Sequence, residues 1–100
     1  MTTHIYNVCK NKGNDRIWLE RSRLTDNGFN RGMRFAKSIS RGVLVLDFTA
    51  TENAQHTIAG TTTRPIIDLC GKWVSTFFGG YTQYTASFDT TRQRITIRHA

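Results

Sequence analysis

The chain has 100 residues, of which 38% are hydrophobic and 11% aromatic, and its formal net charge at neutral pH is +7. This much apolar material is enough for the core of one domain and excludes a disordered chain. The mean hydropathy of −0.43 and the lack of any long apolar run argue against a membrane-spanning helix. The first residues lack the pattern of a secretory signal, so a cytoplasmic protein is predicted.

The positive charge is concentrated in the first half of the chain. Residues 1–50 carry nine basic and four acidic side chains, whereas residues 51–100 carry five and three. Most of the cations are arginines, which form bidentate hydrogen bonds with phosphate and guanine. The charge favours a polyanionic partner, and the alternative is that it serves solubility alone.

The first half is predicted to contain four strands and one short helix. Alternating apolar residues and strand formers place the strands at residues 4–9, 16–20, 33–39 and 43–49. Gly13 and Gly42 mark tight turns between strands. Ser22 can cap the short helix, which buries Leu24 and stops at Gly28.

The second half follows a similar plan. Residues 50–63 are polar and rich in threonine, and they contain at most one edge strand at residues 56–59. Pro65 suits the start of a strand, because it has no N–H to donate. Strands are predicted at residues 66–69, 81–88 and 94–99, with a short helix at residues 71–78. The expected fold is therefore mostly β with two short helices, either barrel-like or sandwich-like.

The two halves are rough copies of each other, about fifty residues apart. Repeat one covers about residues 4–49 and repeat two about residues 56–99. Each copy predicts an apolar strand, a short helix, glycine, and then two strands joined by a tight connection. Such a duplication predicts one domain with pseudo-two-fold symmetry, in which each half completes the core of the other.

No residue pattern predicts a catalytic or metal site. Cys9 and Cys70 lack the spacing of a zinc site or a disulfide framework, and His4, His56 and His99 are scattered. A metal site built from both cysteines and one histidine is the alternative to the preferred interpretation, that the two thiols are buried as small hydrophobic side chains. The carboxylates form no close pair, so no cofactor or catalytic residue is predicted.

Basic side chains flank the predicted turns and form the candidate nucleic-acid-binding set. Four of them surround the first short helix and its exit turn, where they would grip phosphates. Others lie at the first hairpin, along and beyond the third strand, and at the last hairpin. The predicted set is Lys10, Lys12, Arg16, Arg21, Arg23, Arg31, Arg34, Lys37, Arg41, Arg92 and Arg94. The alternative interpretation is a solvated polar surface.

Residues 16–35, which read Arg-Ile-Trp-Leu-Glu-Arg-Ser-Arg-Leu-Thr-Asp-Asn-Gly-Phe-Asn-Arg-Gly-Met-Arg-Phe, and the strand pair that closes at Leu46 carry a family resemblance. They resemble the swapped-hairpin domain of AbrB-type DNA-binding proteins, and most of all its SymE-type toxin branch. The second copy keeps the Gly-x-Trp-Val motif but inverts the Gly-Phe order at residues 78–80. The resemblance implies a barrel of interlocked hairpins, here within one chain, that binds duplex DNA near the bacterial nucleoid.

The chain also resembles the amino-terminal accessory domains of some bacterial and prophage cytosine-5 DNA methyltransferases. This resemblance implies a non-catalytic DNA-binding domain, with the methyltransferase chemistry located beyond Ala100. Cys70 does not follow a proline as the nucleophile of such an enzyme would. Two alternatives stay open. One is a SymE-like toxin that acts on RNA through His56 and arginine clamps, and the other is a protein-interaction module.

Overall fold

A computed structural model describes residues 1–49 and 51–100. Ten strands are present among these residues: β1 (Thr2–Asn7), β2 (Cys9–Asn11), β3 (Asn14–Glu20), β4 (Arg34–Ser40), β5 (Val43–Asp47), β6 (His56–Thr57), β7 (Ala59–Gly60), β8 (Pro65–Cys70), β9 (Gln83–Asp89) and β10 (Arg94–His99). The helical segments are α1 (Ser22–Thr25), the 3-10 turn η1 (Thr51–Asn53) and α2 (Lys72–Phe78). The predicted mostly β fold with two short α-helices is confirmed.

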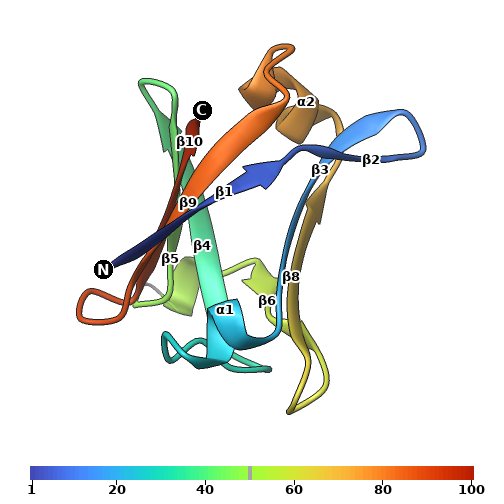
Figure 1. The fold of residues 1–100 in the computed structure, drawn as a ribbon. Coiled ribbons are helices and arrows are strands. Elements are labelled where there is room, and N and C mark those ends of the chain that lie inside the picture. Colours follow the sequence, from blue (N-terminus) through green and yellow to red (C-terminus); the bar gives the residue numbers. More distant parts are fainter. Residues whose placement is uncertain (50) are drawn as a thin grey trace.

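The strands form two antiparallel sheets (Figure 1). The six-stranded sheet has the order β1-β9-β10-β5-β4-β6, and the four-stranded sheet has the order β2-β3-β8-β7. The predicted barrel is wrong, since the sheets do not close into one. The chain passes from one sheet to the other four times. Two of these passages, from β1 to β2 and from β6 to β7, are interruptions of a single residue, at Val8 and Ile58. These two residues donate their N–H groups to the carbonyl oxygens of Thr82 and Met33.

The strand order of each sheet is unchanged when the two halves of the chain are exchanged. If each of the strands β1–β5 exchanges its label with the matching strand of β6–β10, each sheet has the same strand order, read from its other edge. The central pairs of the two sheets, β10 with β5 and β3 with β8, each join one half to the other. Aromatic stacking repeats in the same way. Tyr6 of β1 stacks on Tyr84 of β9 with ring centroids 5.4 Å apart, and His56 of β6 stacks on Phe35 of β4 at 5.3 Å.

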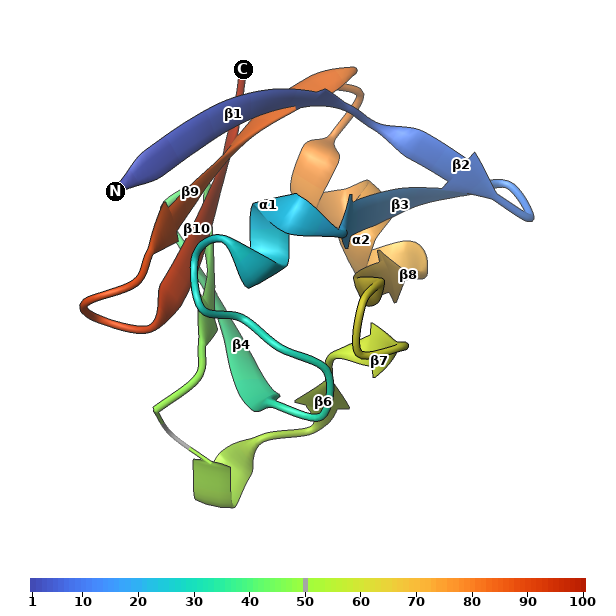
Figure 2. The same ribbon diagram turned by 60° about the horizontal axis from the view of Figure 1, so that its bottom comes forward.

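The core fills the space between the two sheets, because each strand turns alternate side chains inward. In β3 these are Ile17 and Leu19, and their partners across the sheet in β8 are Leu69 and Ile67. Figure 2 shows α1 and the connection to β4 beside this space. The fully buried side chains with the largest volumes are Tyr84, Phe29, Phe35, Phe78, Phe88, Ile17, Leu19, Leu24, Leu44, Leu46, Ile58 and Ile67.

Local details of the two helices differ in part from the sequence-based expectation. Arg21, not Ser22, occupies the N-cap position of α1; its φ is 61°, and its side chain forms no capping hydrogen bond. Helix α1 ends at Thr25 and its C-cap is Asp26 in the right-handed region, so the prediction that Gly28 ends the helix is wrong; Gly28 has a positive φ of 84° in the turn that follows. Among the described residues, no helix is long and apolar enough to cross a membrane.

Candidate nucleic-acid interface

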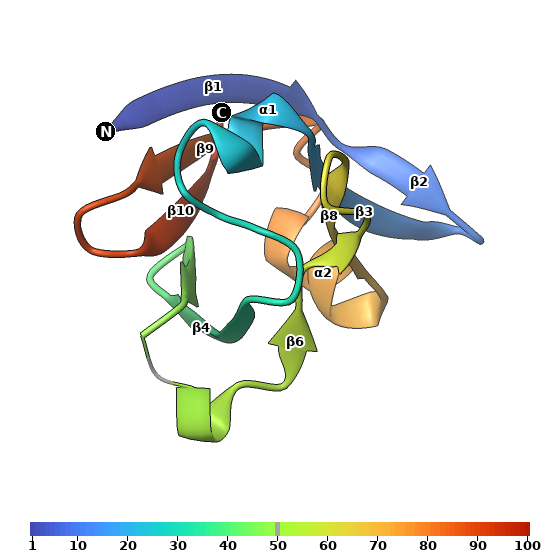
Figure 3. The ribbon, with the colours of Figure 1, turned by 90° about the horizontal axis from the view of Figure 1, so that it is seen from below.

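Three arginines from different parts of the chain meet at one end of β8. The N–H of Arg21 donates to the carbonyl oxygen of Pro65 over 3.0 Å. Pro65 pairs on its other side with Gly60, and the carbonyl oxygen of Gly60 accepts a hydrogen bond of 3.1 Å from Nε of Arg31. Arg64 precedes Pro65 directly. Arg21, Arg31 and Arg64 are therefore each bonded or adjacent to the turn between β7 and β8, and Figure 3 shows these two strands beside α1 and its exit turn.

Arg34 extends this group along β6. It pairs with Thr57 and donates from its guanidinium to the carbonyl oxygen of Ala54 over 2.8 Å. We call Arg21, Arg31, Arg34 and Arg64 the arginine corner. All four residues are exposed.

The exit turn of α1 brings Arg31 to the arginine corner because its two ends are anchored. Phe29 is 1% exposed and packs on Phe48, with ring centroids 4.8 Å apart. Gly32 has a φ of 89° and donates its N–H to the carbonyl oxygen of Ile58 over 2.9 Å. Because Arg31 lies between these anchors, its backbone is held while its side chain reaches the surface.

The arginine corner is an electropositive surface with unused hydrogen-bond donors. A guanidinium has five N–H groups, and Arg31 and Arg34 each direct part of theirs at one backbone carbonyl oxygen. An acidic group also lies nearby, since Oε2 of Glu20 is 3.8 Å from Nε of Arg21. Ion pairs at exposed sites are weak, so this contact leaves Arg21 able to exchange partners. Forked donors of this kind suit phosphate oxygens.

The sequence-based prediction included Arg21, Arg31 and Arg34 but not Arg64. Arg64 was missed because it follows the threonine-rich join, which carries little charge. A signal was available, since Arg64 comes directly before the proline that begins a predicted strand. The turn is tight: the N–H of Thr61 and the N–H of Arg64 each donate to the other residue's carbonyl oxygen, over 3.1 and 3.2 Å.

The first hairpin holds its cations away from the arginine corner. Lys10 forms an ion pair with the buried carboxylate of Asp15, and Lys12 is exposed at the turn. Arg16 donates to both carboxylate oxygens of Asp68, over 2.7 and 2.8 Å, and its guanidinium lies 4.3 Å from the ring centroid of Trp18. The hydrogen bond to Asp68 raises the pKa of Arg16. Arg16 is thus held within the four-stranded sheet.

The remaining predicted residues lie in three further places. Arg23, on α1, contacts the ring nitrogens of His4. Arg41 takes a positive φ in the turn between β4 and β5. Arg92 and Arg94 line a hollow on the outer face of the six-stranded sheet, together with Arg98. The eleven predicted residues therefore do not form one continuous surface.

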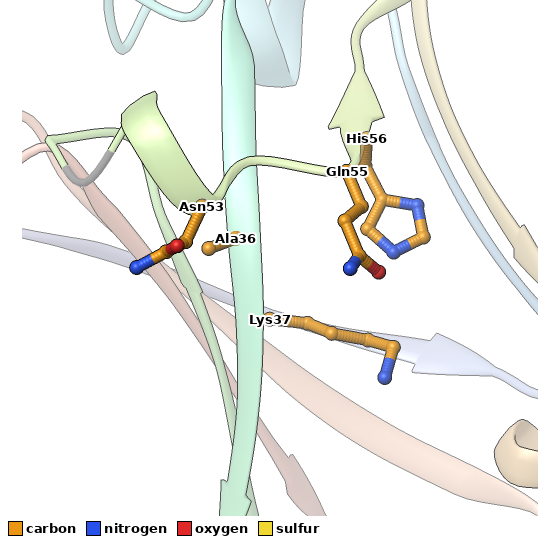
Figure 4. Close-up of a pocket in the computed structure, with 5 residues that line it drawn as sticks. All are labelled: Ala36, Lys37, Asn53, Gln55 and His56. Atoms are coloured by element: carbon orange, nitrogen blue, oxygen red, sulfur yellow. The ribbon is translucent and has the colours of Figure 1, made fainter.

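Lys37 belongs to a separate pocket of about 170 Å³, lined by Ala36, Lys37, Asn53, Gln55 and His56. Figure 4 shows the side chains of Lys37, Gln55 and His56 directed into the same space. Burial lowers the pKa of His56, and the charge of Lys37 lowers it further. The imidazole is therefore neutral at pH 7 and can accept a proton. The lining residues include no carboxylate.

The two cysteines are not buried, which corrects the preferred interpretation. Cys9 is exposed and Cys70 is half-buried, and each is a cross-strand neighbour of Arg16 in the four-stranded sheet. Their strands lie on opposite sides of β3, so the two thiols flank one guanidinium. Within residues 1–49 and 51–100, no three histidine, cysteine or acidic side chains are grouped to hold a metal ion.

Comparisons with protein-family models, with curated proteins and with solved structures found no match for this chain.

Proposed function

We propose that this chain is a non-catalytic DNA-binding domain that grips the phosphate backbone of duplex DNA through the arginine corner. The observation that carries the proposal is that four exposed arginines lie beside one segment, residues 54–65. Arg64 belongs to this segment, and Arg21 before α1, Arg31 in its exit turn and Arg34 on β4 each donate a hydrogen bond to it. The net charge of +7 adds long-range attraction to a polyanion. Backbone contacts of this kind give affinity without reading sequence.

The proposed fold is a duplicated, AbrB-like arrangement in which two hairpins interlock. Its support is that the hairpins β4–β5 and β9–β10 pair with each other through β5 and β10. The strand orders, unchanged by exchange of the halves, support an internal pseudo-two-fold axis. The position of the domain ahead of a cytosine-5 methyltransferase stays a prediction.

Salt dependence tests the electrostatic mechanism. Fluorescence anisotropy would follow the binding of a labelled DNA duplex at several salt concentrations. Release of counterions predicts that affinity falls by roughly a hundredfold between about 50 and 200 mM salt, for about four phosphate contacts. An affinity that does not change with salt would contradict the proposal.

A pair of charge-matched double variants tests the location. Arg31→Gln with Arg64→Gln removes two charges from the arginine corner, and Lys12→Gln with Arg92→Gln removes two charges elsewhere. We expect the first pair to reduce the slope of log affinity against log salt by about two, whereas the second pair changes it little. Equal losses from both pairs would mean that only net charge matters.

An RNA-directed activity is the second candidate, and the shared pocket of His56 and Lys37 favours it. Incubation with single-stranded RNA would test it, with His56→Ala as the control. Cleavage that disappears in His56→Ala would replace the DNA proposal. RNA that stays intact, together with salt-sensitive binding of duplex DNA, would support the DNA proposal.

A further inference from the structure

Strand β4 has an edge that the fold leaves open. On one side it pairs with β5 from Ala36 to Ser40, and on the other side it pairs with β6 only through Arg34 and Phe35. Figure 4 shows the strand that holds His56 ending there while β4 continues past Lys37. In the part of the chain that the structure describes, no strand pairs with the second edge of residues 36–40.

The other half of the molecule shows what can occupy such an edge. There β9 is paired on the corresponding side by β1 along all six residues of β1, from Thr2 opposite Phe88 to Asn7 opposite Gln83. The matching strand, β6, has only two residues, and the chain before it turns into η1. The fold thus pairs a full strand with one of two topologically equivalent edges. Beside the other edge it places η1 and the segment that leads to β6, which contact β4 near Ala36 and Lys37 without pairing as a strand.

The side chains beside the open edge define the chemistry of an occupant. Lys37 and Ile39 lie on the same face of β4, and Ile39 is 48% exposed although it is a large apolar residue. Nζ of Lys37 lies 4.5 Å from the ring centroid of Trp73 on α2. Ser38 and Ser40, on the opposite face, are exposed. One face therefore offers a cation next to apolar surface, and the other offers small hydroxyl groups.

We propose that the open edge of β4 binds an extended acidic segment of a partner protein by antiparallel strand addition. The exposed edge supplies main-chain hydrogen bonds, which give affinity to any extended peptide. Specificity comes from the cross-strand neighbours. An apolar side chain opposite Ile39 would cover its exposed surface, and a carboxylate opposite Lys37 would neutralise its charge.

Charge also explains why this edge would select such a partner over a second copy of the chain. Charged side chains on edge strands hinder edge-to-edge association of identical proteins. A β4–β4 pair centred on Ser38 would place the two Lys37 side chains diagonally across from each other, in two chains that each carry a net charge of +7. An acidic segment reverses this repulsion, so one residue disfavours self-pairing and favours the partner.

A charge-swap experiment tests the proposal on the intact chain. The probe is a short fluorescein-labelled peptide with the core Thr-Val-Thr-Glu-Thr, which in antiparallel register sets Val opposite Ile39 and Glu opposite Lys37. The control is a basic peptide of the same sequence in which Lys replaces Glu. We expect Lys37→Glu to weaken binding of the acidic peptide by about three- to tenfold and to strengthen binding of the basic peptide similarly. Lys12→Glu, with the same change in net charge, should leave the preference for the acidic peptide in place.

Amide hydrogen exchange locates the bound peptide. Addition of the acidic peptide should slow exchange within residues 36–40 and leave β9, already paired on both sides, unchanged. No binding of the acidic peptide, or binding that Lys37→Glu and Lys12→Glu weaken equally, would overturn the proposal. A dimer that protects residues 36–40 without peptide would also overturn it, because the occupant would then be a second copy.

Discussion

Gly60 lets the turn between β7 and β8 close beneath the arginine corner. Its φ is 87°, and a Cβ atom at this position would lie 2.2 Å from the carbonyl oxygen of Arg64. The neighbouring backbone would therefore have to move. We expect Gly60→Ala to lower the free energy of unfolding by more than about 2 kcal/mol, measured by urea denaturation.

Gly32→Ala is the matched control for this prediction. Gly32 has a similar φ of 89°, but a Cβ atom there would meet no heavy atom within 4 Å. This variant reports the strain of a positive φ alone, and we expect it to cost about 1 kcal/mol. Equal losses of stability in the two variants would contradict the predicted clash at Arg64.

His56 makes stability depend on pH. Its pKa lies below the usual 6.5 because the ring is partly buried and because Lys37 is close. The folded state therefore binds fewer protons than the unfolded state below pH 6.5, and its stability falls as the pH falls toward the lowered pKa. We expect the urea midpoint to decrease between about pH 7 and pH 5.5, and to decrease less in His56→Phe, which keeps an aromatic ring against Phe35. The same decrease in both proteins would show that other groups cause it.

At the scale of elements, the pairing of β3 with β8 brings Arg16 to Asp68, although the sequence analysis predicted that Arg16 binds nucleic acid. Arg16 is 52 residues from its ion-pair partner, Asp68. We expect Arg16→Met to change DNA affinity less than about twofold and to lower the free energy of unfolding by less than about 1 kcal/mol, because exposed ion pairs contribute little. Anisotropy and urea denaturation measure the two effects. A large loss of DNA affinity would return Arg16 to the binding surface.

The sequence predicted most strands because their inward side chains alternate. In β3 the pattern Ile17-Trp18-Leu19 has period two, and the structure places Ile17 and Leu19 in the core. The partner of Arg16 could not be predicted in the same way. It depends on the register between β3 and β8, which long-range pairing sets. The nearness of Arg31 to the turn that holds Arg64 also depends on a long-range contact, the hydrogen bond from Arg31 to Gly60.

At the scale of the whole molecule, the repeated order of elements was visible in the sequence, but the closure of the sheets was not. The expected barrel requires strand pairing that joins the edges of the two sheets. No such pairing is present among the described residues, and the strands that lead from one sheet to the other are interrupted at Val8 and Ile58. Each of these residues donates a backbone hydrogen bond to a residue far away in the sequence, so no local pattern predicts the interruption. The separation of the arginine corner from the hairpin cations follows from the same three-dimensional arrangement.

The pairing of the two halves predicts that neither half folds alone. The central pair of each sheet joins one half to the other, so an isolated half would expose its inner face and lose the pairing of β3 or β8 and of β5 or β10. We expect fragments 1–53 and 54–100 to lack β structure by circular dichroism when separate, and to regain it when mixed in equal amounts. Gel filtration of the mixture should give one species of the size of the intact chain. A fragment that folds as a monomer by itself would show that its core is complete without the other half, against the cross-half packing of Ile17 and Leu19 on Leu69 and Ile67.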